Sequence, residues 1–256
     1  MTSFLVSESV LIKWSTSNRG SVKSEKMTML DYPADCGQPQ HEYVCEAAKH
    51  KQDQVKMLAY ALMGQLEGWC SHEKASIMMD IVFLLKAETV VEIGVFGGKS
   101  LVPMACACKA NGKGVVYGID PWDAGESAKG MEGVNLEWWG NLDHDKIYTD
   151  LKRKVKKFDL DSYINLLRCT SEEAPIFEEI DILHIDGNHS EDASLYDVMK
   201  WVPLVRKGGV IILDDIGWVD EETGSGTAKA VQYLNEHCIP FVEVEGDNQW
   251  GIWIKP

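Results

Sequence analysis

The chain has 256 residues, of which 45% are hydrophobic, and a formal net charge of −15. This length fits one domain with at most a modest appendage, and the apolar content is enough to fill a sizeable core. The negative charge argues against nucleic acid or an anionic membrane as a partner, because binding to either needs a positive surface. The basic run at 151–157 (LKRKVKK) is more simply a solvated helix face than a binding patch.

Cysteine usage and hydropathy indicate the compartment. The chain has seven cysteines, an odd number without the pattern of a small disulfide-stabilised domain, so we expect buried free thiols in a reducing compartment. No stretch reaches the roughly 18–20 apolar residues that span a bilayer, and the first residues lack the pattern of a secretory leader. We therefore expect a soluble, cytoplasmic protein.

Residues 1–50 are mixed and polar, with many turn formers at 31–40 (DYPADCGQPQ), and they predict an irregular N-terminal arm. Whether this arm covers a substrate, contacts another subunit or stays disordered is left open. Residues 51–256 form the predicted main domain. Helical periodicity begins near its start, and Ser71 is placed to cap a helix with an apolar stripe of Ile77, Ile81, Leu84 and Leu85.

Strands and helices alternate through the main domain. Short apolar runs predict strands at 89–93, 114–119, 162–167, 181–185 and 208–215, with two more near the C-terminus at 241–245 and 251–255. This order predicts an α/β fold: a Rossmann-like, doubly wound, mostly parallel seven-stranded sheet with a C-terminal antiparallel strand pair and an N-terminal helical arm. Ligands bind at the carboxyl ends of the strands in such sheets, so functional residues should follow strands.

The turn after the first strand, VVEIGVFGGKS at 90–100, ends like a nucleotide-binding P-loop. Gly94 and Gly98 bracket three residues where a P-loop needs four, which excludes that interpretation. A dinucleotide fingerprint needs glycine where Phe96 stands, but an NAD-dependent oxidoreductase is kept as an alternative, with Asp120 as its ribose ligand. The run Glu92-x-Gly94-x-x-x-Gly98 instead resembles the first motif of class I S-adenosylmethionine (SAM)-dependent methyltransferases. Its glycines let the backbone approach the cofactor, and the acidic residue suits a cationic ligand.

This resemblance implies cofactor contacts after each of the first four strands. Asp120 ends the second strand about 26 residues beyond Gly94, where the family places a carboxylate that binds the ribose. Ser171 follows the third strand, where the family contacts adenine, although it suits a helix N-cap equally well. The full set of candidate cofactor contacts is Glu92, Gly94, Gly98, Ser100, Asp120, Trp122, Thr170, Ser171 and Asp186.

Two acidic motifs, HIDGNHSED and LDDIG, follow the fourth and fifth strands. The ends of these strands are neighbours in a doubly wound sheet, so Asp186, Asp214 and Asp215 can converge. Crowded carboxylates repel one another unless a cation neutralises them, and oxygen ligands favour Mg²⁺. His189 lies three residues after Asp186, close enough to face the same pocket, whereas His184 lies within an apolar strand and is expected in the core.

These motifs resemble the metal-dependent O-methyltransferases, including catechol O-methyltransferase, and more closely their bacterial branch that acts on macrolide sugars. The likeness covers roughly residues 70–256 and implies Asp186, Asp214 and Asp215 as Mg²⁺ ligands and His189 as the general base. The catechol enzyme has lysine where His189 stands, and asparagine is common at the position of Asp215. Both departures favour the sugar or natural-product branch.

The predicted function is therefore methyl transfer from SAM to a hydroxyl of a small molecule: a sugar, a natural product or an aromatic compound. A second alternative is a non-catalytic SAM-binding module. Trp138 and Trp139, in the long segment 123–161, either stack on a ring of the acceptor or pack an inserted helix. Relatives are often dimers or larger, so a homo-oligomer is left open, as is the identity of the acceptor.

Overall fold

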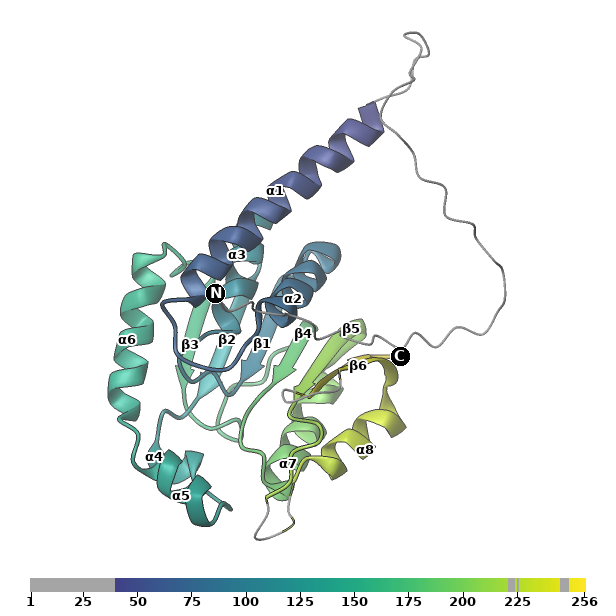
Figure 1. Cartoon of the computed structure of the whole chain (residues 1–256). Coiled ribbons are helices and arrows are strands. Elements are labelled where there is room, and N and C mark those ends of the chain that lie inside the picture. The colour runs from purple at the N-terminus through teal and green to yellow at the C-terminus, as the bar shows by residue number, and fades with distance from the viewer. Residues whose placement is uncertain (1–39, 221–223, 225, 245–248) are drawn as a thin grey trace, which may run out of the picture.

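The computed structural model of the chain describes residues 40–220, 224, 226–244 and 249–256. Their seven strands form one sheet in the order β3-β2-β1-β4-β5-β7-β6 (Figure 1). The strands from β3 to β5 pair in parallel, and β7 runs antiparallel to both β5 and β6. The strand bounds are β1 Thr89–Ile93, β2 Val115–Asp120, β3 Ile164–Arg168, β4 Ile180–Ile185, β5 Val205–Asp214, β6 Ile239–Val244 and β7 Trp250–Ile254. This topology confirms the predicted fold class.

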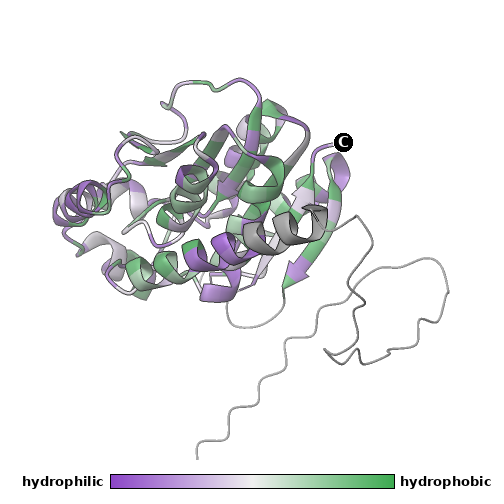
Figure 2. Cartoon of the chain, turned by 90° about the horizontal axis from the view of Figure 1, so that it is seen from above, coloured by the Kyte–Doolittle hydropathy of each residue, from purple (hydrophilic) through white to green (hydrophobic). Residues whose placement is uncertain are grey.

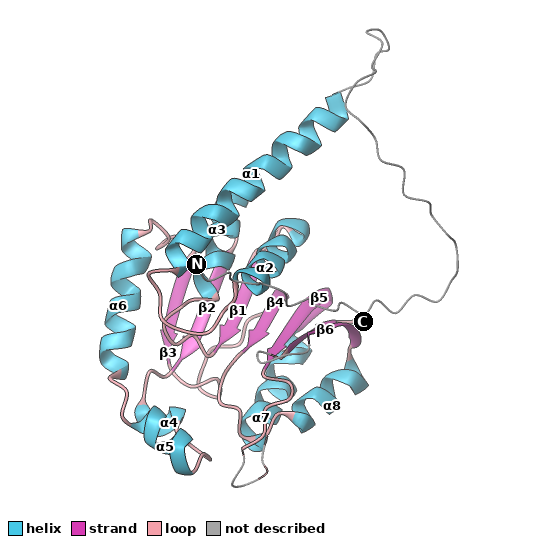
Figure 3. Cartoon of the chain, in the orientation of Figure 1, coloured by secondary structure: helices cyan, strands magenta, loops and turns pink. Residues whose placement is uncertain are grey.

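Helices cover both faces of the sheet (Figure 3). One hydrophobic core joins α1, α2, α3 and α6 to the first face, and a second joins α7 and α8 to the other. The short helices α4 and α5 lie beyond the carboxyl ends of the strands (Figure 1). The helix bounds are α1 Gln40–Met63, α2 His72–Leu85, α3 Leu101–Asn111, α4 Ala124–Ser127, α5 Gly133–Gly140, α6 His144–Lys157, α7 Glu191–Trp201, the 3-10 turn η1 Val202–Leu204 and α8 Ala228–His237.

The central strands are buried on both sides, which explains their continuous apolar runs. Successive side chains of a strand point to opposite faces, so Val90 of β1 joins the first core and Val91 joins the second. Figure 2 shows hydrophobic residues along the strands and hydrophilic ones on the outer sides of helices. Even-numbered residues near the ends of β1, β4 and β5 therefore share the face covered by α2 and α3.

Several local expectations can be compared with this architecture. The Ser71 Oγ accepts a hydrogen bond of 3.1 Å from the Lys74 amide and caps α2, as predicted. The basic run at 151–157 lies on α6, where Leu151 and Val155 are buried and the basic side chains face outward. Among the described residues, no helix is long and apolar enough to cross a membrane.

The structure departs from the predicted irregular arm at 1–50 in the C-terminal part of that segment. Residues 40–50 are not irregular: they form the first turns of α1, which continues without a break to Met63. Residues 1–39 lie outside the described residues. The main domain thus begins within a long helix, part of which packs on α3.

Candidate functional site

The turn after β1 needs glycine at two positions. Gly94 has φ +82°, and a Cβ atom there would lie 1.9 Å from the carbonyl oxygen of Asp186 after β4. Gly98 has φ +81°, and its Cβ would lie 2.6 Å from a methyl group of Leu151 on α6. Gly94 therefore lets the ends of β1 and β4 touch, whereas Gly98 lets α6 pack against the turn.

Asp120 at the end of β2 holds the same turn. One carboxylate oxygen accepts hydrogen bonds of 2.9 Å from the backbone amides of Val95 and Phe96, and the other accepts one of 2.7 Å from Trp122. The Trp122 indole is buried, and its Nε1 donates to the carbonyl of Phe96 at 2.9 Å. Phe96 and Trp122 both have positive φ, at +49° and +43°, a backbone strain that clusters at functional sites.

A cavity of about 590 Å³ opens at the carboxyl ends of the strands. This size is within the range of small-molecule sites, about 300–1,000 Å³. Segment 124–140, which contains α4 and α5, forms one wall through Glu126, Lys129 and Trp139. Of the residues predicted from the sequence, those that line the cavity are Gly94, Asp120, Trp122, Thr170, Ser171, Asp186 and His189.

The predicted contacts Glu92, Gly98, Ser100, Asp214 and Asp215 do not line this cavity. Glu92 is fully buried and points to the α2–α3 face of the sheet, the same face as Val90. There its carboxylate accepts a hydrogen bond of 2.9 Å from Ser100 Oγ and lies 3.1 Å from His184 Nδ1. Glu92 and Ser100 thus bind each other and support the turn from behind.

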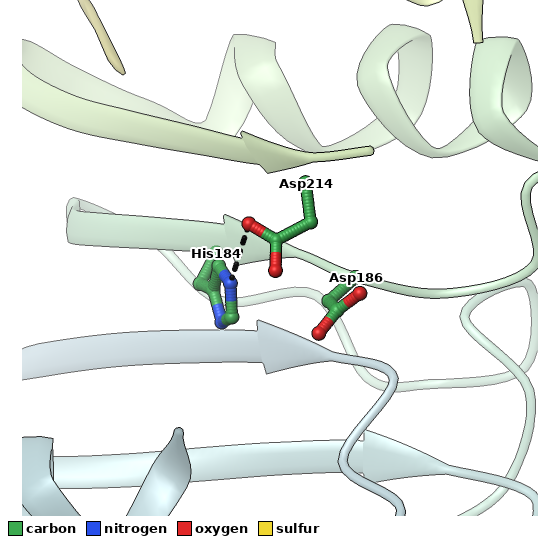
Figure 4. Close-up of side chains that lie close together, drawn as sticks. All are labelled: His184, Asp186 and Asp214. Carbon is green, nitrogen blue, oxygen red and sulfur yellow. Dashed lines mark ion pairs between the residues drawn. The ribbon is translucent and has the colours of Figure 1, made fainter. Parts of the chain in front are cut away.

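The same face carries a buried polar row, which comprises Glu92, His184, Asp214 and Lys74. Glu92 pairs with His184 in the register of β1 and β4, and His184 Nε2 lies 3.4 Å from Asp214 Oδ1 (Figure 4). Lys74 reaches the row from α2: its Nζ lies 3.2 Å from His184 Nε2 and forms an ion pair with Asp214 Oδ2. His184 is a hydrogen-bonded core residue, as expected, but Lys74 was missed by the sequence-based prediction.

The predicted metal ligands divide into two groups that share Asp186. Oxygen or nitrogen ligand atoms of Asp186, Asp214 and His184 lie within 4.8 Å of one another, and so do those of Asp186, His189 and Asp215. Figure 4 shows Asp214 at the end of β5 and Asp186 just after the end of β4. His189 Nε2 lies 3.3 Å from Asp215 Oδ2 and 3.7 Å from Asp186 Oδ1. The structure therefore brings His189 between two carboxylates.

Burial and the short distances between charged side chains shift the pKa values of Asp186, Asp214 and His189. Burial, together with the nearby Asp214 carboxylate, raises the pKa of Asp186 to about 6. Burial alone would also raise the pKa of Asp214, but the Lys74 ammonium and His184 hold it well below its usual range. Burial would lower the pKa of His189, but the carboxylates of Asp186 and Asp215 outweigh it and raise that pKa.

The corner formed by Asp186, His189 and Asp215 suits a divalent cation. Two carboxylates supply the hard oxygen ligands that Mg²⁺ prefers, and imidazole nitrogen is a further ligand type for transition metals. His189 Nε2 is buried and has no hydrogen-bond partner among the described residues, although it lies between acidic groups. An unsatisfied buried nitrogen in this position fits a site that is completed by an ion or a substrate.

The segment after β3 forms a turn where one interpretation placed a helix. Thr170 Oγ1 accepts a hydrogen bond of 3.2 Å from the Glu173 amide, and Ser171 Oγ donates to Asp197 of α7. Ser171 is therefore no helix N-cap. Both residues line the cavity and remain candidate cofactor contacts.

Four aromatic rings gather beside the turn after β1. Trp69, from the loop between α1 and α2, stacks on Phe96 with ring centroids 5.3 Å apart, and its centroid lies 5.5 Å from that of Trp138. Trp139 meets Phe96 edge-on at 5.9 Å. Phe96 and Trp139 line the cavity, whereas Trp138 does not. The two tryptophans of α5 thus pack a helix, and one of them also faces the site.

Part of the chain matches a known protein family. Residues 91–216 match the family model that is described as a methyltransferase domain. The match begins within β1 and ends just after Asp214 and Asp215, so it spans the turn, the cavity and the acidic cluster. No protein of curated function matches the sequence.

Solved structures share the fold at low sequence identity. A methyltransferase from Podospora anserina bound to S-adenosylhomocysteine (SAH) has 12% identity and a TM-score of 0.55, with 88% of this chain and 100% of that chain covered. An O-methyltransferase from Streptomyces achromogenes involved in tomaymycin synthesis, in complex with SAM, has 15% identity and a TM-score of 0.52, covering 80% and 90%. An O-methyltransferase from Bacillus cereus in complex with SAH has 15% identity and a TM-score of 0.50, covering 80% and 91%. These likenesses show the fold.

Proposed function

We propose that the chain is a class I SAM-dependent methyltransferase, as the match of residues 91–216 to a methyltransferase domain supports, and that it methylates a hydroxyl oxygen of a small molecule with the help of Mg²⁺. One observation carries the proposal. A single cavity is lined at one side by Gly94 and Asp120, and at another by Asp186 and His189. A methyl donor and an acceptor can therefore meet in one cavity, next to a group able to take a proton. The family match decides against the nicotinamide-dependent oxidoreductase.

The cofactor is proposed to bind along the turn after β1. The strained backbone from Gly94 to Phe96 faces the cavity, and Asp120, Thr170 and Ser171 supply polar groups on the neighbouring strand ends. SAM supplies an electrophilic methyl group, so no covalent enzyme intermediate is needed and orientation accounts for most of the catalysis. The SAM- and SAH-bound structures of the same fold support this placement.

His189 is proposed as the general base. Its Nε2 is the nitrogen that lies next to Asp186 and Asp215, and it is free of hydrogen bonds within the described chain. When the imidazole takes the proton of the acceptor hydroxyl, the two carboxylates stabilise the positive charge that forms. The same carboxylates orient the ring toward the cavity.

Mg²⁺ is proposed to be held by the predicted cluster, with Asp186, Asp214 and Asp215 as candidate ligands. An ion held there would lower the pKa of the acceptor hydroxyl and fix its position. The O-methyltransferases among the similar folds support methylation at oxygen. The net charge of −15 supports a small-molecule acceptor rather than nucleic acid, and the free thiols of Cys70, Cys106, Cys108, Cys169 and Cys238 support a reducing compartment.

The test is a comparison of cofactor binding and turnover. Calorimetry with SAH is expected to show binding by the wild-type protein and by His189→Gln with similar affinity. SAM incubated with hydroxyl-bearing compounds is expected to give SAH and methylated product, at a rate that His189→Gln lowers by about 100-fold or more. Binding of SAH without turnover of any acceptor would favour the non-catalytic module, and no binding would refute the proposal as a whole.

A further inference from the structure

Lys74 places a positive charge inside the acidic cluster. It comes from the first turn of α2, which precedes the matched domain at 91–216. Its side chain is 5% exposed, and its ammonium forms the ion pair with Asp214 Oδ2 while it also contacts His184. A buried ammonium is stable only when it is paired, so this contact fixes both partners.

The ion pair changes what Asp214 can do. Its Oδ2 is taken by Lys74, and its Oδ1 faces His184 at 3.4 Å. A divalent cation bound to the same carboxylate would lie close to an ammonium of like charge. Oδ2 is thus paired within the chain, whereas Oδ1 is buried and has no hydrogen-bond partner among the described residues.

Asp215 lies in a different environment. Its side chain is 35% exposed, against 9% for that of Asp214, and its oxygen faces His189 rather than an ammonium. The backbone of Asp215 has φ +51° and so leaves the extended conformation of β5, which ends at Asp214. The two neighbouring aspartates therefore serve opposite sides: Asp214 points to α2, and Asp215 joins the corner with Asp186 and His189.

We propose that Lys74 is a resident cation that removes Asp214 from the set of metal ligands, so that Mg²⁺ is held by Asp186 and Asp215 alone among the three aspartates. This proposal rests on the metal dependence proposed above and names the residues responsible for it. It also extends the functional unit beyond the matched domain, because α2 supplies one of its charges.

The experiment measures Mn²⁺ binding to the full chain by electron paramagnetic resonance, with Mg²⁺ as the competitor and without SAM or acceptor. Asp215→Asn is expected to weaken Mn²⁺ binding by about tenfold or more, because it removes a ligand. The double variant Lys74→Met/Asp214→Asn, which removes both charges of the buried pair, is expected to bind within about threefold of wild type. Lys74→Met alone frees Asp214 and is expected to bind Mn²⁺ more tightly.

The controls separate folding from binding. Lys56→Met removes another lysine that pairs with α2, through Asp80 at 2.6 Å, and should leave Mn²⁺ binding unchanged. If Lys74→Met does not fold, the double variant still tests whether Asp214 is a metal ligand. A loss of Mn²⁺ binding in the double variant as large as in Asp215→Asn would overturn the proposal, and so would unchanged affinity in a folded Lys74→Met.

The wild-type result distinguishes this proposal from the proposed function. If wild type binds no Mn²⁺ but Lys74→Met does, Lys74 occupies the site in place of a metal: its role as a resident cation is supported, and metal dependence fails. If neither binds Mn²⁺, both ideas fail. SAH binding, measured on the same samples, reports separately on the methyltransferase assignment.

Discussion

The Asp120 carboxylate accepts a hydrogen bond of 2.9 Å from the backbone amide of Phe96, which ties the end of β2 to the turn after β1. The same oxygen binds the Val95 amide, so a single side chain holds two successive amides of a strained turn. Asp120 thereby shapes the surface on which the cofactor is proposed to lie, in addition to offering a carboxylate to the cavity.

Asp120→Asn is expected to weaken SAH binding by about tenfold or more, because an amide cannot accept all three backbone hydrogen bonds and those to a charged group are worth about 1.5–3 kcal/mol. Calorimetry with SAH measures the effect. Asp150→Asn, which alters an exposed ion pair with Arg153 on α6, is the matched control and should bind normally. Equal affinities for the two variants would show that the turn does not depend on Asp120.

Gly94→Ala is expected to destabilise the fold by about 2 kcal/mol or more, because its Cβ would collide with the backbone of Asp186 in addition to straining a positive φ. Gly112→Ala is a matched control, since Gly112 has φ +71° but nothing within 4 Å of its Cβ. It should lose only about 1 kcal/mol from the conformational strain. Urea denaturation gives both values, and similar losses would mean that the contact between β1 and β4 is easily relaxed.

Asp197→Asn is expected to change the pH dependence of stability. Burial raises the pKa of Asp197 to about 6, although the Ser171 hydroxyl and Lys200 act in the other direction. Because the folded pKa lies above the unfolded value of about 3.9, the contribution of the bound proton is complete below the unfolded pKa and is lost as the pH rises through the folded pKa. The wild-type protein should therefore lose on the order of 2 kcal/mol between about pH 4 and pH 7 that the asparagine variant does not lose.

Denaturation of apo protein across this range measures the difference between Asp197→Asn and wild type. The exposed Asp192 on the same helix provides the control Asp192→Asn, whose curve should run parallel to that of wild type. A constant offset between Asp197→Asn and wild type at all pH values would contradict the raised pKa.

Trp139→Ala is expected to raise the KM for the acceptor by about tenfold, because this ring faces the cavity, with kcat less affected. Trp138→Ala removes the neighbouring ring, which does not line the cavity, and should change KM by less than about threefold. Steady-state kinetics with any acceptor found in the turnover screen measures both. Equal effects of the two substitutions would mean that both tryptophans only pack the helix.

The sheet and the cavity follow closely from local patterns in the sequence. Buried strands give apolar runs, and residues that follow them, such as Gly94, Asp120 and Asp186, necessarily lie at one edge of a parallel sheet. Seven of the predicted site residues accordingly line the cavity. Their position depends on strand order alone, which alternation of strands and helices already predicts.

The residues whose positions were not predicted from the sequence depend on contacts between distant parts of the chain. Glu92 was expected to face the cofactor, but it shares a sheet face with Val90 and binds Ser100 and His184. Lys74 lies four and eight residues before the buried Met78 and Val82, so helical spacing places it on the core side of α2. A lysine on the buried side of a helix indicates a buried acidic partner, but the sequence does not show which carboxylate pairs with it.

The contact between Gly94 and the backbone of Asp186 also bears on how ligands enter and leave. The two loops that carry the cofactor turn and the acidic residues touch main chain to main chain, and neither can swing outward without displacing the other. Segment 124–140 forms another wall of the cavity and is held to the loop after β4 by side-chain hydrogen bonds from Asn188, including one of 2.8 Å to the carbonyl of Lys129. Exchange of this segment between related chains would alter which acceptor enters and how quickly product leaves, while the proposed catalytic residues at the strand ends stay unchanged.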